Sequence, residues 1–195
     1  MRPTNVVPNA AKAGLRQEVR ERIGAITPEQ RALASQRACA RLQEQGRWKE
    51  AQSILFYAPL PDELDIWPLI PIALAAGKQL FLPRFDPGSN CYLAHCIRDP
   101  EIDLQPGKYG IREPGPHCPQ LPLNRLDFVL APGIAFDLHG RRLGRGRGYY
   151  DHILAAVRGI TCGVAFDQQI VPEIPVEPHD ITVRCILTPS RWIEP

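Results

Sequence analysis

The sequence predicts an α/β fold with a mostly parallel central sheet. Short apolar segments alternate along the chain with segments in which apolar residues recur every three or four positions. This alternation is typical of parallel strands joined by crossover helices. The first clear strand, residues 53–58 (SILFYA), is apolar at consecutive positions, which indicates burial on both faces of a sheet.

Length and composition predict one globular domain. The 195 residues, 44% of them hydrophobic, suffice for one sizeable core, so we expect a single domain over residues 1–195 with a frayed end at 1–9. The formal net charge of +2 is too small to indicate a nucleic-acid partner. No apolar run approaches the roughly 18 residues of a membrane span, and the N-terminus lacks the apolar core of a secretory signal. We therefore expect a cytoplasmic protein that binds neither membrane nor nucleic acid.

The six cysteines predict neither a disulfide framework nor a zinc site. They lie at positions 39, 91, 96, 118, 162 and 185, and no pair has the spacing of a Cys-x-x-Cys motif. Cysteines of a cytoplasmic protein normally stay reduced. We expect six free thiols.

The N-terminal part of the chain predicts two helices. Apolar residues at every fourth position predict a helix over residues 10–23, and Lys12 and Arg16 share one face of it. The spacing of these two cations alone favours a solvated surface. Residues 27–30 (TPEQ) form a capping box with proline at the first helical position, which predicts the start of a second helix that ends at Gly46.

A candidate ligand-binding loop follows the strand at 53–58. Residues 59–63 (PLPDE) would leave the sheet at the carboxyl end of that strand, where open α/β sheets place their ligands. Glu63 is therefore a candidate polar contact, although a glutamate in a loop is more commonly exposed to solvent. A proline-shortened helix over 65–76 and a strand over 79–83 are expected next.

Residues 84–125 contain seven prolines, and these exclude long helices. Residues 90–97 alternate enough to predict a strand. The segment 108–114 (KYGIREP) is a predicted loop. Its Tyr109 could stack on a planar ligand, although half-buried packing is the default for such a residue.

The rest of the chain continues the alternation of strands and helices. We expect a strand over 126–131, a helix over 151–157, a strand over 160–166, a proline-rich connection over 174–181 and a last strand over 184–188.

The segment between the strand at 126–131 and the next helix predicts a site for polyphosphate. Glycines at 140, 144, 146 and 148 alternate with arginines at 141, 142, 145 and 147. Glycine lets main-chain amides approach a ligand, a helix N-terminus adds unpaired donors, and arginine matches phosphate oxygens. Tyr149, Tyr150 and Asp151 follow immediately, as expected for a folded site.

Two other interpretations of this segment remain open. A Gly-Arg run is also typical of a solvated basic turn or of an RNA-binding tail, although this one joins a strand to a helix. The segment is not a P-loop, because no Gly-Lys-Ser/Thr ends it. It also lacks the glycine spacing of a dinucleotide-binding fingerprint.

Five segments together resemble one enzyme family. Residues 131–151 (APGIAFDLHGRRLGRGRGYYD) resemble the signature of 5-formyltetrahydrofolate cyclo-ligases, also called methenyltetrahydrofolate synthetases. Residues 12–16 (KAGLR) are similar to the family's N-terminal motif, and Glu63 matches its acidic loop. Residues 82–84 and 110–114 are also similar to the family, so the resemblance covers nearly the whole chain.

The resemblance implies a three-layer α/β/α sandwich and an ATP- and Mg²⁺-dependent ligase. The implied reaction converts 5-formyltetrahydrofolate to 5,10-methenyltetrahydrofolate with release of ADP and phosphate. The formyl oxygen is phosphorylated, and N10 then closes the ring. The substrate is a small molecule, a reduced formyl folate that can be polyglutamylated, and we expect a monomer.

The resemblance also assigns site residues, with Arg145 and Tyr149 as catalytic groups. Asp151 would ligate Mg²⁺, which prefers oxygen ligands, and helix capping is a second role open to it. Folate contacts are implied for Glu63, Tyr109, Arg145, Gly148 and Tyr149. ATP contacts are implied for Lys12, Arg16, Arg142, Leu143, Gly144, Arg145, Gly146, Arg147, Gly148, Tyr149 and Tyr150.

One position departs from the family pattern. The family has a second aspartate near its C-terminal strand, in a pattern like Asp-x-x-Val-Asp, whereas Asp180 and Val183 are followed here by Arg184. Mg²⁺ then relies more on water and phosphate, or Asp180 substitutes, or turnover is weak. The alternative function is therefore a catalytically weak or inactive relative that binds folate or nucleotide. His139 and His179 lie in predicted loops and receive no role.

Overall fold

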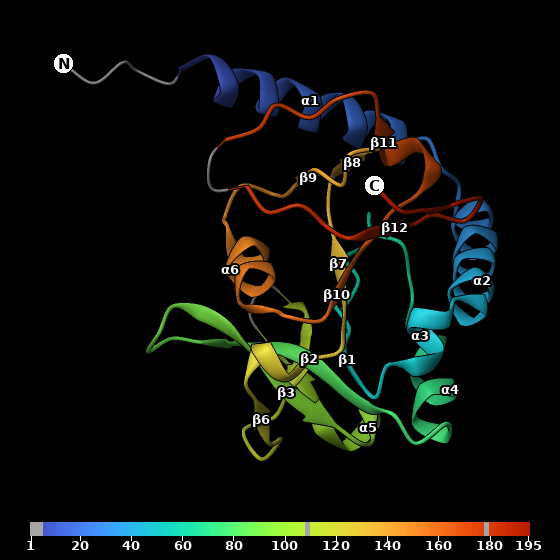
Figure 1. Cartoon of the computed structure of the whole chain (residues 1–195), viewed down its shortest axis with the longest axis vertical. Helices are drawn as coiled ribbons and strands as arrows, with labels where there is room; N and C mark the ends of the chain where they lie inside the picture. The colour runs from blue at the N-terminus through green and yellow to red at the C-terminus, as the bar shows by residue number, and fades with distance from the viewer. Residues whose placement is uncertain (1–5, 108–109, 178–179) are drawn as a thin grey trace.

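The computed structural model describes residues 6–107, 110–177 and 180–195 (Figure 1). At its centre is an eight-stranded sheet in which five neighbouring strands run parallel and the strands at the two edges pair antiparallel. In order across the sheet, the strands are β13 (Trp192–Ile193), β12 (Cys185–Leu187), β10 (Ile160–Val164), β7 (Phe128–Pro132), β1 (Ser53–Leu55), β2 (Gln79–Asp86), β3 (Cys91–Ile97) and β6 (Gln120–Leu121).

Helices cover both faces of this sheet and give the molecule three layers (Figure 1). Residues of α6 (Tyr149–Ala156) pack on one face. The three layers and the mostly parallel sheet confirm the predicted fold class. The helices that pack on the other face are α1 (Val6–Gly24), α2 (Pro28–Glu44), α3 (Gly46–Glu50) and α4 (Leu69–Ala75).

Successive residues of the central strands point into opposite layers, as the pleat of a strand requires. In β1, Ile54 packs with the cluster under α1 to α4, and Leu55 packs with the cluster under α6. In the neighbouring β7, Phe128 and Val129 divide in the same way. All four side chains are fully buried. Burial on both faces explains why these strands are apolar at consecutive positions.

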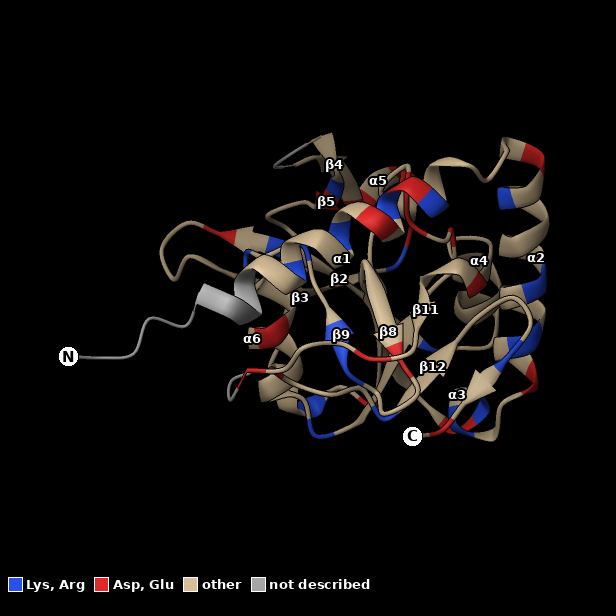
Figure 2. Ribbon diagram, turned by 90° about the horizontal axis from the view of Figure 1, so that it is seen from above, with Lys and Arg blue, Asp and Glu red and all other residues tan. Residues whose placement is uncertain are grey.

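Smaller elements lie outside the central sheet. A three-stranded sheet and a two-stranded sheet lie outside the central one, and α1 crosses the top of the molecule over the former (Figures 1 and 2). These elements are α5 (Pro100–Asp103), β4 (Leu104–Pro106), β5 (Arg112–Pro114), η2 (Leu123–Arg125), β8 (Ala135–Asp137), β9 (Arg142–Leu143), η3 (Asp167–Gln169) and β11 (Ile170–Val171).

Several predicted boundaries are wrong. Helix α1 begins at Val6 instead of residue 10, because proline is tolerated in the first turn of a helix. Helix α4 begins at Leu69 instead of 65, because Pro68 occupies its N-cap. Gly46 begins α3 instead of only ending α2.

The predicted capping box and the predicted free thiols are confirmed. Thr27 and Gln30 form the capping box, in which the Gln30 amide donates to Thr27 Oγ1 at 3.3 Å and the Thr27 amide donates to Gln30 Oε1 at 2.9 Å. All six cysteines are free thiols. None of the described helices is long and apolar enough to cross a membrane.

Candidate functional site

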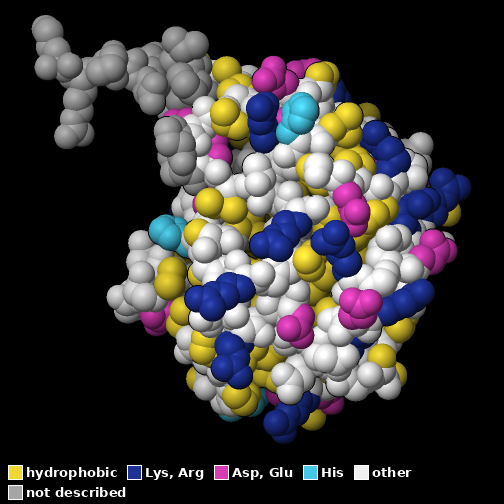
Figure 3. Space-filling model, in the orientation of Figure 1, with side chains coloured by type: hydrophobic (Ala, Val, Ile, Leu, Met, Phe, Trp, Pro, Cys, Tyr) yellow, Lys and Arg dark blue, Asp and Glu magenta, His cyan; other side chains and the backbone are white. Residues whose placement is uncertain are grey.

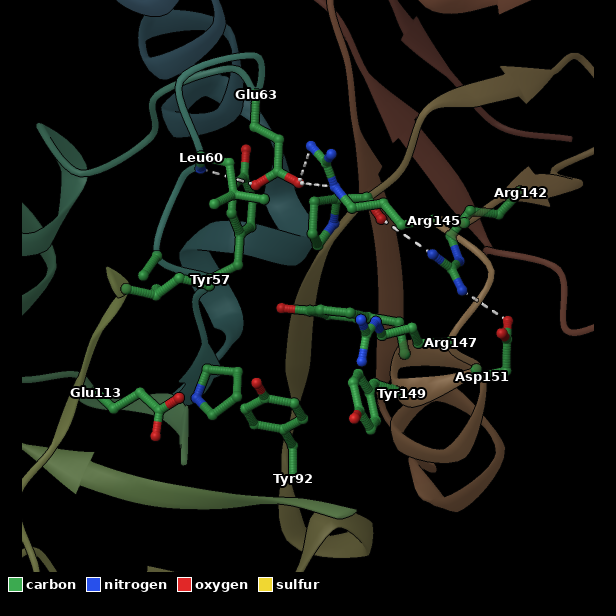
Figure 4. Close-up of a pocket in the computed structure, with 17 residues that line it drawn as sticks. Tyr57, Leu60, Glu63, Tyr92, Glu113, Arg142, Arg145, Arg147, Tyr149 and Asp151 are labelled. Carbon is green, nitrogen blue, oxygen red and sulfur yellow. Dashed lines mark hydrogen bonds and ion pairs between the residues drawn. The ribbon is translucent and has the colours of Figure 1, made fainter. Parts of the chain in front are cut away.

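A cavity of about 280 Å³ opens at the carboxyl ends of β1 and β7 (Figure 4). Tyr57 and Ala58 line it just after β1, and Pro132 lines it at the end of β7. Strand β2 is added on one side of β1, and β7 lies on the other. The winding of the sheet therefore reverses between β1 and β7, and open α/β sheets bind their ligands at such a point.

The segment 140–148, which we call the glycine–arginine loop, forms one side of this cavity. It ends at Gly148, which caps α6 in the left-handed conformation with φ of 70° and without a side-chain cap. An L-residue with a side chain rarely adopts this conformation. The first amides of α6 are thereby presented at the edge of the cavity, as a helix N-terminus presents donors to an anion.

Arg142 is held in place by two partners. Only 8% of the residue is exposed. Its Nη1 donates to the Pro132 carbonyl at 3.2 Å, and its Nη2 donates to Asp151 Oδ1 at 2.6 Å. The guanidinium also lies 5.8 Å from the ring centre of Tyr150. The Arg142 charge is thus fixed beside the start of α6 before any ligand binds.

Arg145 is paired with the acidic loop that follows β1 (Figure 4). Its Nη2 lies 2.6 Å from Asp62 Oδ1 and 3.1 Å from Glu63 Oε1. Burial raises the pKa of the Glu63 carboxyl, and the hydrogen bond from the Leu60 amide and the Arg145 charge offset only part of this rise. The structure therefore pairs Arg145, a predicted ATP contact, with Glu63, a predicted folate contact.

The two cations of α1 reach the same region. Lys12 is only 6% exposed, so the solvated surface favoured by its spacing is wrong. Its Nζ lies 2.7 Å from both Glu177 Oε2 and Asp180 Oδ2. Burial lowers the pKa of Lys12, but the two carboxylates raise it by a larger amount, so the pKa lies above its usual value. Arg16 is half-buried, and its Nε donates to the Gly144 carbonyl at 2.9 Å, which docks α1 on the glycine–arginine loop.

An aromatic cluster lies at the cavity. The Tyr149 ring meets the Tyr92 ring edge to face at 5.0 Å, and the Phe85 ring lies 5.4 Å from that of Tyr92. Tyr92 and Tyr149 line the cavity. Tyr57 is fully buried, its hydroxyl donates to the Leu64 carbonyl, and burial raises its pKa well above the usual value. The cavity wall is therefore mostly apolar, with flat surfaces suited to a planar ligand.

Most of the predicted site residues line the cavity, but not all do. Leu143 is buried in the core, so its side chain is not available to a nucleotide. Lys12, Arg16 and Gly146 do not line the cavity either, and Tyr109 lies outside the described residues. The predicted residues that do line it are Glu63, Arg142, Gly144, Arg145, Arg147, Gly148, Tyr149, Tyr150 and Asp151.

Among the described residues, the predicted metal ligand Asp151 belongs to no group of three potential metal ligands. Asp151 lines the cavity, with Oδ1 taken by Arg142. Within the described part of the chain, the group of three metal-binding side chains is Asp103, His117 and Cys118, which lies outside the cavity. A single carboxylate fits Mg²⁺ only when phosphate and water supply the remaining oxygens, an arrangement common for this ion.

Three polar or aromatic groups that line the cavity were not predicted: Tyr57, Tyr92 and Glu113. Glu113 lies in the segment 110–114 that carries the resemblance, and Tyr57 lies just before the loop at 59–63, but the residues predicted there were Tyr109 and Glu63. Proximity to those motifs was therefore an available signal. Tyr92 carried none, because its approach to Tyr149 depends on how β3 packs against α6.

Comparison with known families gives one consistent result. A model of the 5-formyltetrahydrofolate cyclo-ligase family matches residues 8–189. The chain is 35% identical to 5-formyltetrahydrofolate cyclo-ligase of Escherichia coli strain K12 over 177 residues, which cover 89% of this chain and 97% of that relative. It is 32% identical to the Mus musculus cyclo-ligase over 198 residues, which cover 93% of this chain and 95% of that one.

Solved structures agree with this result. The NMR structure of Aquifex aeolicus 5,10-methenyltetrahydrofolate synthetase superposes with a TM-score of 0.85 at 32% identity and covers 94% of this chain and 92% of its own. A synthetase from Mycoplasma pneumoniae superposes with a TM-score of 0.73 over 91% of this chain and 98% of its own. The latter is 17% identical and supports the fold alone.

Proposed function

The chain belongs to the 5-formyltetrahydrofolate cyclo-ligase family, and we propose that it uses ATP to convert 5-formyltetrahydrofolate to 5,10-methenyltetrahydrofolate with release of ADP and phosphate. The observation that carries this proposal is the cavity between β1 and β7. Arginines of the glycine–arginine loop lie along one side of it, and carboxylates and aromatic rings lie along the others (Figure 4).

The chemistry requires an activated oxygen. A formamide oxygen is a poor leaving group, and phosphorylation turns it into a good one. In the proposed sequence the formyl oxygen bonds to the γ-phosphorus as ADP leaves, N10 then bonds to the formyl carbon, and phosphate leaves as the N10 proton passes to solvent. Catalysis of such a transfer is mainly positioning and neutralisation of charge.

The residues of the cavity suit these tasks. Arg142 is fixed by Pro132 and Asp151, so its charge is in place for a phosphate. Arg145 would exchange carboxylate oxygens for phosphate oxygens, and the amides at the start of α6 would add donors. Tyr149 would pack against the folate ring.

A bound Mg²⁺ ion would neutralise phosphate charge. We propose Asp151 as its protein ligand, because a carboxylate at the cavity edge beside the α6 N-terminus is a suitable hard donor. Lys12 and Arg16 would act on the nucleotide from α1 only through a rearrangement, since Lys12 is held by Glu177 and Asp180.

A second candidate function rests on Arg184 and Asp180. Arg184 is exposed and replaces the aspartate that the family pattern has. Asp180, its possible substitute, is engaged by Lys12 and also accepts the Glu177 amide at 2.7 Å. A weak or inactive relative that binds folate or nucleotide is therefore the alternative to full turnover.

We also propose that residues 1–195 act as one domain and one monomer in the cytoplasm, on a folate that can carry a polyglutamate tail. Light scattering during gel filtration tests the monomer directly. On the face drawn in Figure 3, basic side chains are interspersed with acidic and apolar ones, which gives the RNA-binding hypothesis little support.

A coupled ATPase assay tests the function. ADP is expected only when 5-formyltetrahydrofolate, ATP and Mg²⁺ are all present, in amounts equal to the methenyl product measured by its absorbance. Chelation of the metal should stop both signals. Absence of folate-dependent ADP would contradict the main proposal, and binding without product at high enzyme concentration would favour the weak relative.

The variant Arg184→Asp sharpens this test. If the missing carboxylate limits metal binding, the variant should turn over faster and need less Mg²⁺ for half-maximal rate. Arg158→Asp, also exposed, serves as the matched control for the change of charge. An equal effect of the two variants would show that net charge, not position, is responsible.

A further inference from the structure

Glu113 is a buried carboxylate that the reaction described above does not use. It lies on β5 and is only 7% exposed. Its Oε2 accepts a hydrogen bond from the Phe85 amide at 3.2 Å. Its Oε1 is buried and has no hydrogen-bond partner among the described residues. Buried acceptors are nearly always satisfied in native proteins, so an unpaired one requires an explanation.

The fold holds this carboxylate in place. A Cβ atom on residue 107 would lie 2.4 Å from Glu113 Cγ and 2.5 Å from its Cδ, so the side chain rests against the bare backbone of Gly107. The neighbouring Arg112 points elsewhere, since its Nη2 donates to the Pro100 carbonyl at 2.7 Å. None of the described ion pairs includes Glu113. Among the described residues, the carboxylate therefore has no cation as a partner.

Glu113 lines the same cavity as the glycine–arginine loop, but at the other end (Figure 4). The view shows Glu113 and Tyr92 on one side and Arg142 and Asp151 on the opposite side. Phe85, whose amide bonds to Glu113, carries one ring of the aromatic cluster that includes Tyr149. An unpaired acceptor thus lies beside flat apolar surfaces, and the cationic groups lie across the cavity.

These features define the chemistry of a ligand. A buried carboxylate with a spare oxygen is matched by a group that presents adjacent N–H donors in one plane. Aromatic neighbours favour a planar heterocycle. The aminopyrimidinone ring of a reduced folate has such an edge, formed by its 2-amino group and the N3–H, while N5 with its formyl group lies on the other ring of the bicycle.

We propose that Glu113 accepts hydrogen bonds from the aminopyrimidinone edge of the substrate and so determines which way the substrate lies in the cavity. The inference rests on the proposed function. With that edge held at Glu113, the formyl group faces away from β5, toward the side of the cavity that carries the arginines. Glu113 is then a substrate-orienting residue, distant from the phosphoryl group.

Glutamine at position 113 tests the proposal with little change of shape. Two N–H groups, the Phe85 amide and the substrate edge, need acceptors at position 113. A glutamine side chain has only one acceptor oxygen, so one of the two N–H groups must face the NH2 group of the glutamine and lose its hydrogen bond. A second variant, Glu113→Leu, removes both acceptors and excludes rescue by rotation of the amide. Both variants are compared with Glu50→Gln, an exposed glutamate in α3.

The measurement is calorimetric binding without ATP. Two compounds are used: 5-formyltetrahydrofolate and its analogue with a methyl group in place of the 2-amino group. Wild type and Glu50→Gln should prefer the amino compound by about tenfold or more. Glu113→Gln and Glu113→Leu should bind the amino compound about tenfold more weakly, and their preference should fall toward one. Because the preference is a ratio within one variant, partial loss of folded protein does not change it.

The outcomes separate the two proposals. If wild type binds the amino compound and both Glu113 variants retain its affinity and preference, the role of Glu113 is wrong and the proposed function stands. If wild type binds neither compound, the proposed function fails and the role of Glu113 fails with it. In steady state the variants should raise the KM for the folate and leave the KM for ATP unchanged, whereas a merely structural defect would change both.

Discussion

The two ends of the cavity differ in how their charges are satisfied. At one end Arg142 is paired with Asp151, and Arg145 is paired with Asp62 and Glu63. At the other end Glu113 has an acceptor oxygen without a partner among the described residues. Arg142 and Glu113 are shielded from solvent to a similar degree, at 8% and 7% exposed, whereas Arg145 is exposed. Between the two buried groups, Arg142 and Glu113, the difference therefore concerns partners and not burial.

This difference predicts different costs of binding. A phosphate that enters the arginine end must replace carboxylates that already pair with the arginines. The free energy of the broken ion pairs therefore reduces the net free energy of phosphate binding. A donor that reaches Glu113 relieves an unsatisfied buried acceptor, which costs about 1–3 kcal/mol when left unpaired. The arginine end is thus preorganised for charge, and the Glu113 end is poised to recognise neutral N–H groups.

The variant Arg145→Ala should give the largest loss of activity, because it removes one of the arginines at the arginine end. It removes a phosphate contact and also leaves Glu63 without its cation. We expect kcat/KM to fall roughly 100- to 1000-fold, as for loss of one donor to a developing charge, with a raised KM for ATP. Steady-state kinetics with each substrate varied in turn provide the measurement.

Arg158→Ala is the matched control, because Arg158 is exposed beyond α6 and away from the cavity. It should leave kcat/KM unchanged. An Arg145→Ala enzyme that retained wild-type kinetics would show that Arg145 serves only to hold the acidic loop, and the arginine end would then have to be assigned to Arg142 and Arg147.

Tyr149 gives a smaller effect, and it tests the apolar side of the cavity. Its ring contacts those of Tyr92 and Phe85, so Tyr149→Ala removes a wall of the ligand site. We expect the KM for the folate to rise about tenfold, since an aromatic pair contributes about 0.5–1.5 kcal/mol beyond the area that it buries. The KM for ATP should change less.

Tyr149→Phe separates the ring from the hydroxyl. If packing is the role of Tyr149, the phenylalanine variant should keep the wild-type KM for the folate. A loss of kcat in Tyr149→Phe as large as in Tyr149→Ala would instead assign the hydroxyl to catalysis, as the family resemblance suggests.

The sequence was most informative where structure is local. The apolar run at 53–58 predicted a buried parallel strand because a strand covered on both faces needs apolar residues at every position. The capping box at Thr27 was predicted because its atoms lie within four residues of one another. Boundaries set by tertiary contacts were missed, as in β2, which continues to Asp86 by pairing with β3.

The candidate site was predictable only as a set of residues. The glycine–arginine loop was identified from its composition, and nine predicted residues line the cavity. Their partners were not predictable, because the contact of Arg145 with Glu63 joins positions 82 residues apart. The spare oxygen of Glu113 depends in turn on where Phe85 and Gly107 lie in the folded chain.

The smallest predicted effect is a pH dependence of stability at Glu63, which pairs with Arg145 at the arginine end. Burial raises the pKa of this carboxyl above its ordinary value of 4.5, and the Arg145 charge offsets part of the rise. Because the folded state holds the proton more tightly than the unfolded state, stability is lost as pH rises from about 4.5 through the folded pKa. The melting temperature of wild type minus that of Glu63→Gln should therefore decrease over this window, by less than about 5 °C.

Arg145→Ala should move this window to higher pH, because it removes the cation that opposes the rise in pKa. Calorimetry at a series of pH values then gives the melting temperature of Arg145→Ala minus that of the double variant Arg145→Ala/Glu63→Gln. A difference that increases with pH in either background would mean that Glu63 is stabilised in its charged form. The arginine end would then act as a true ion pair that resists exchange, and a phosphate would have to bind without displacing Glu63 from Arg145.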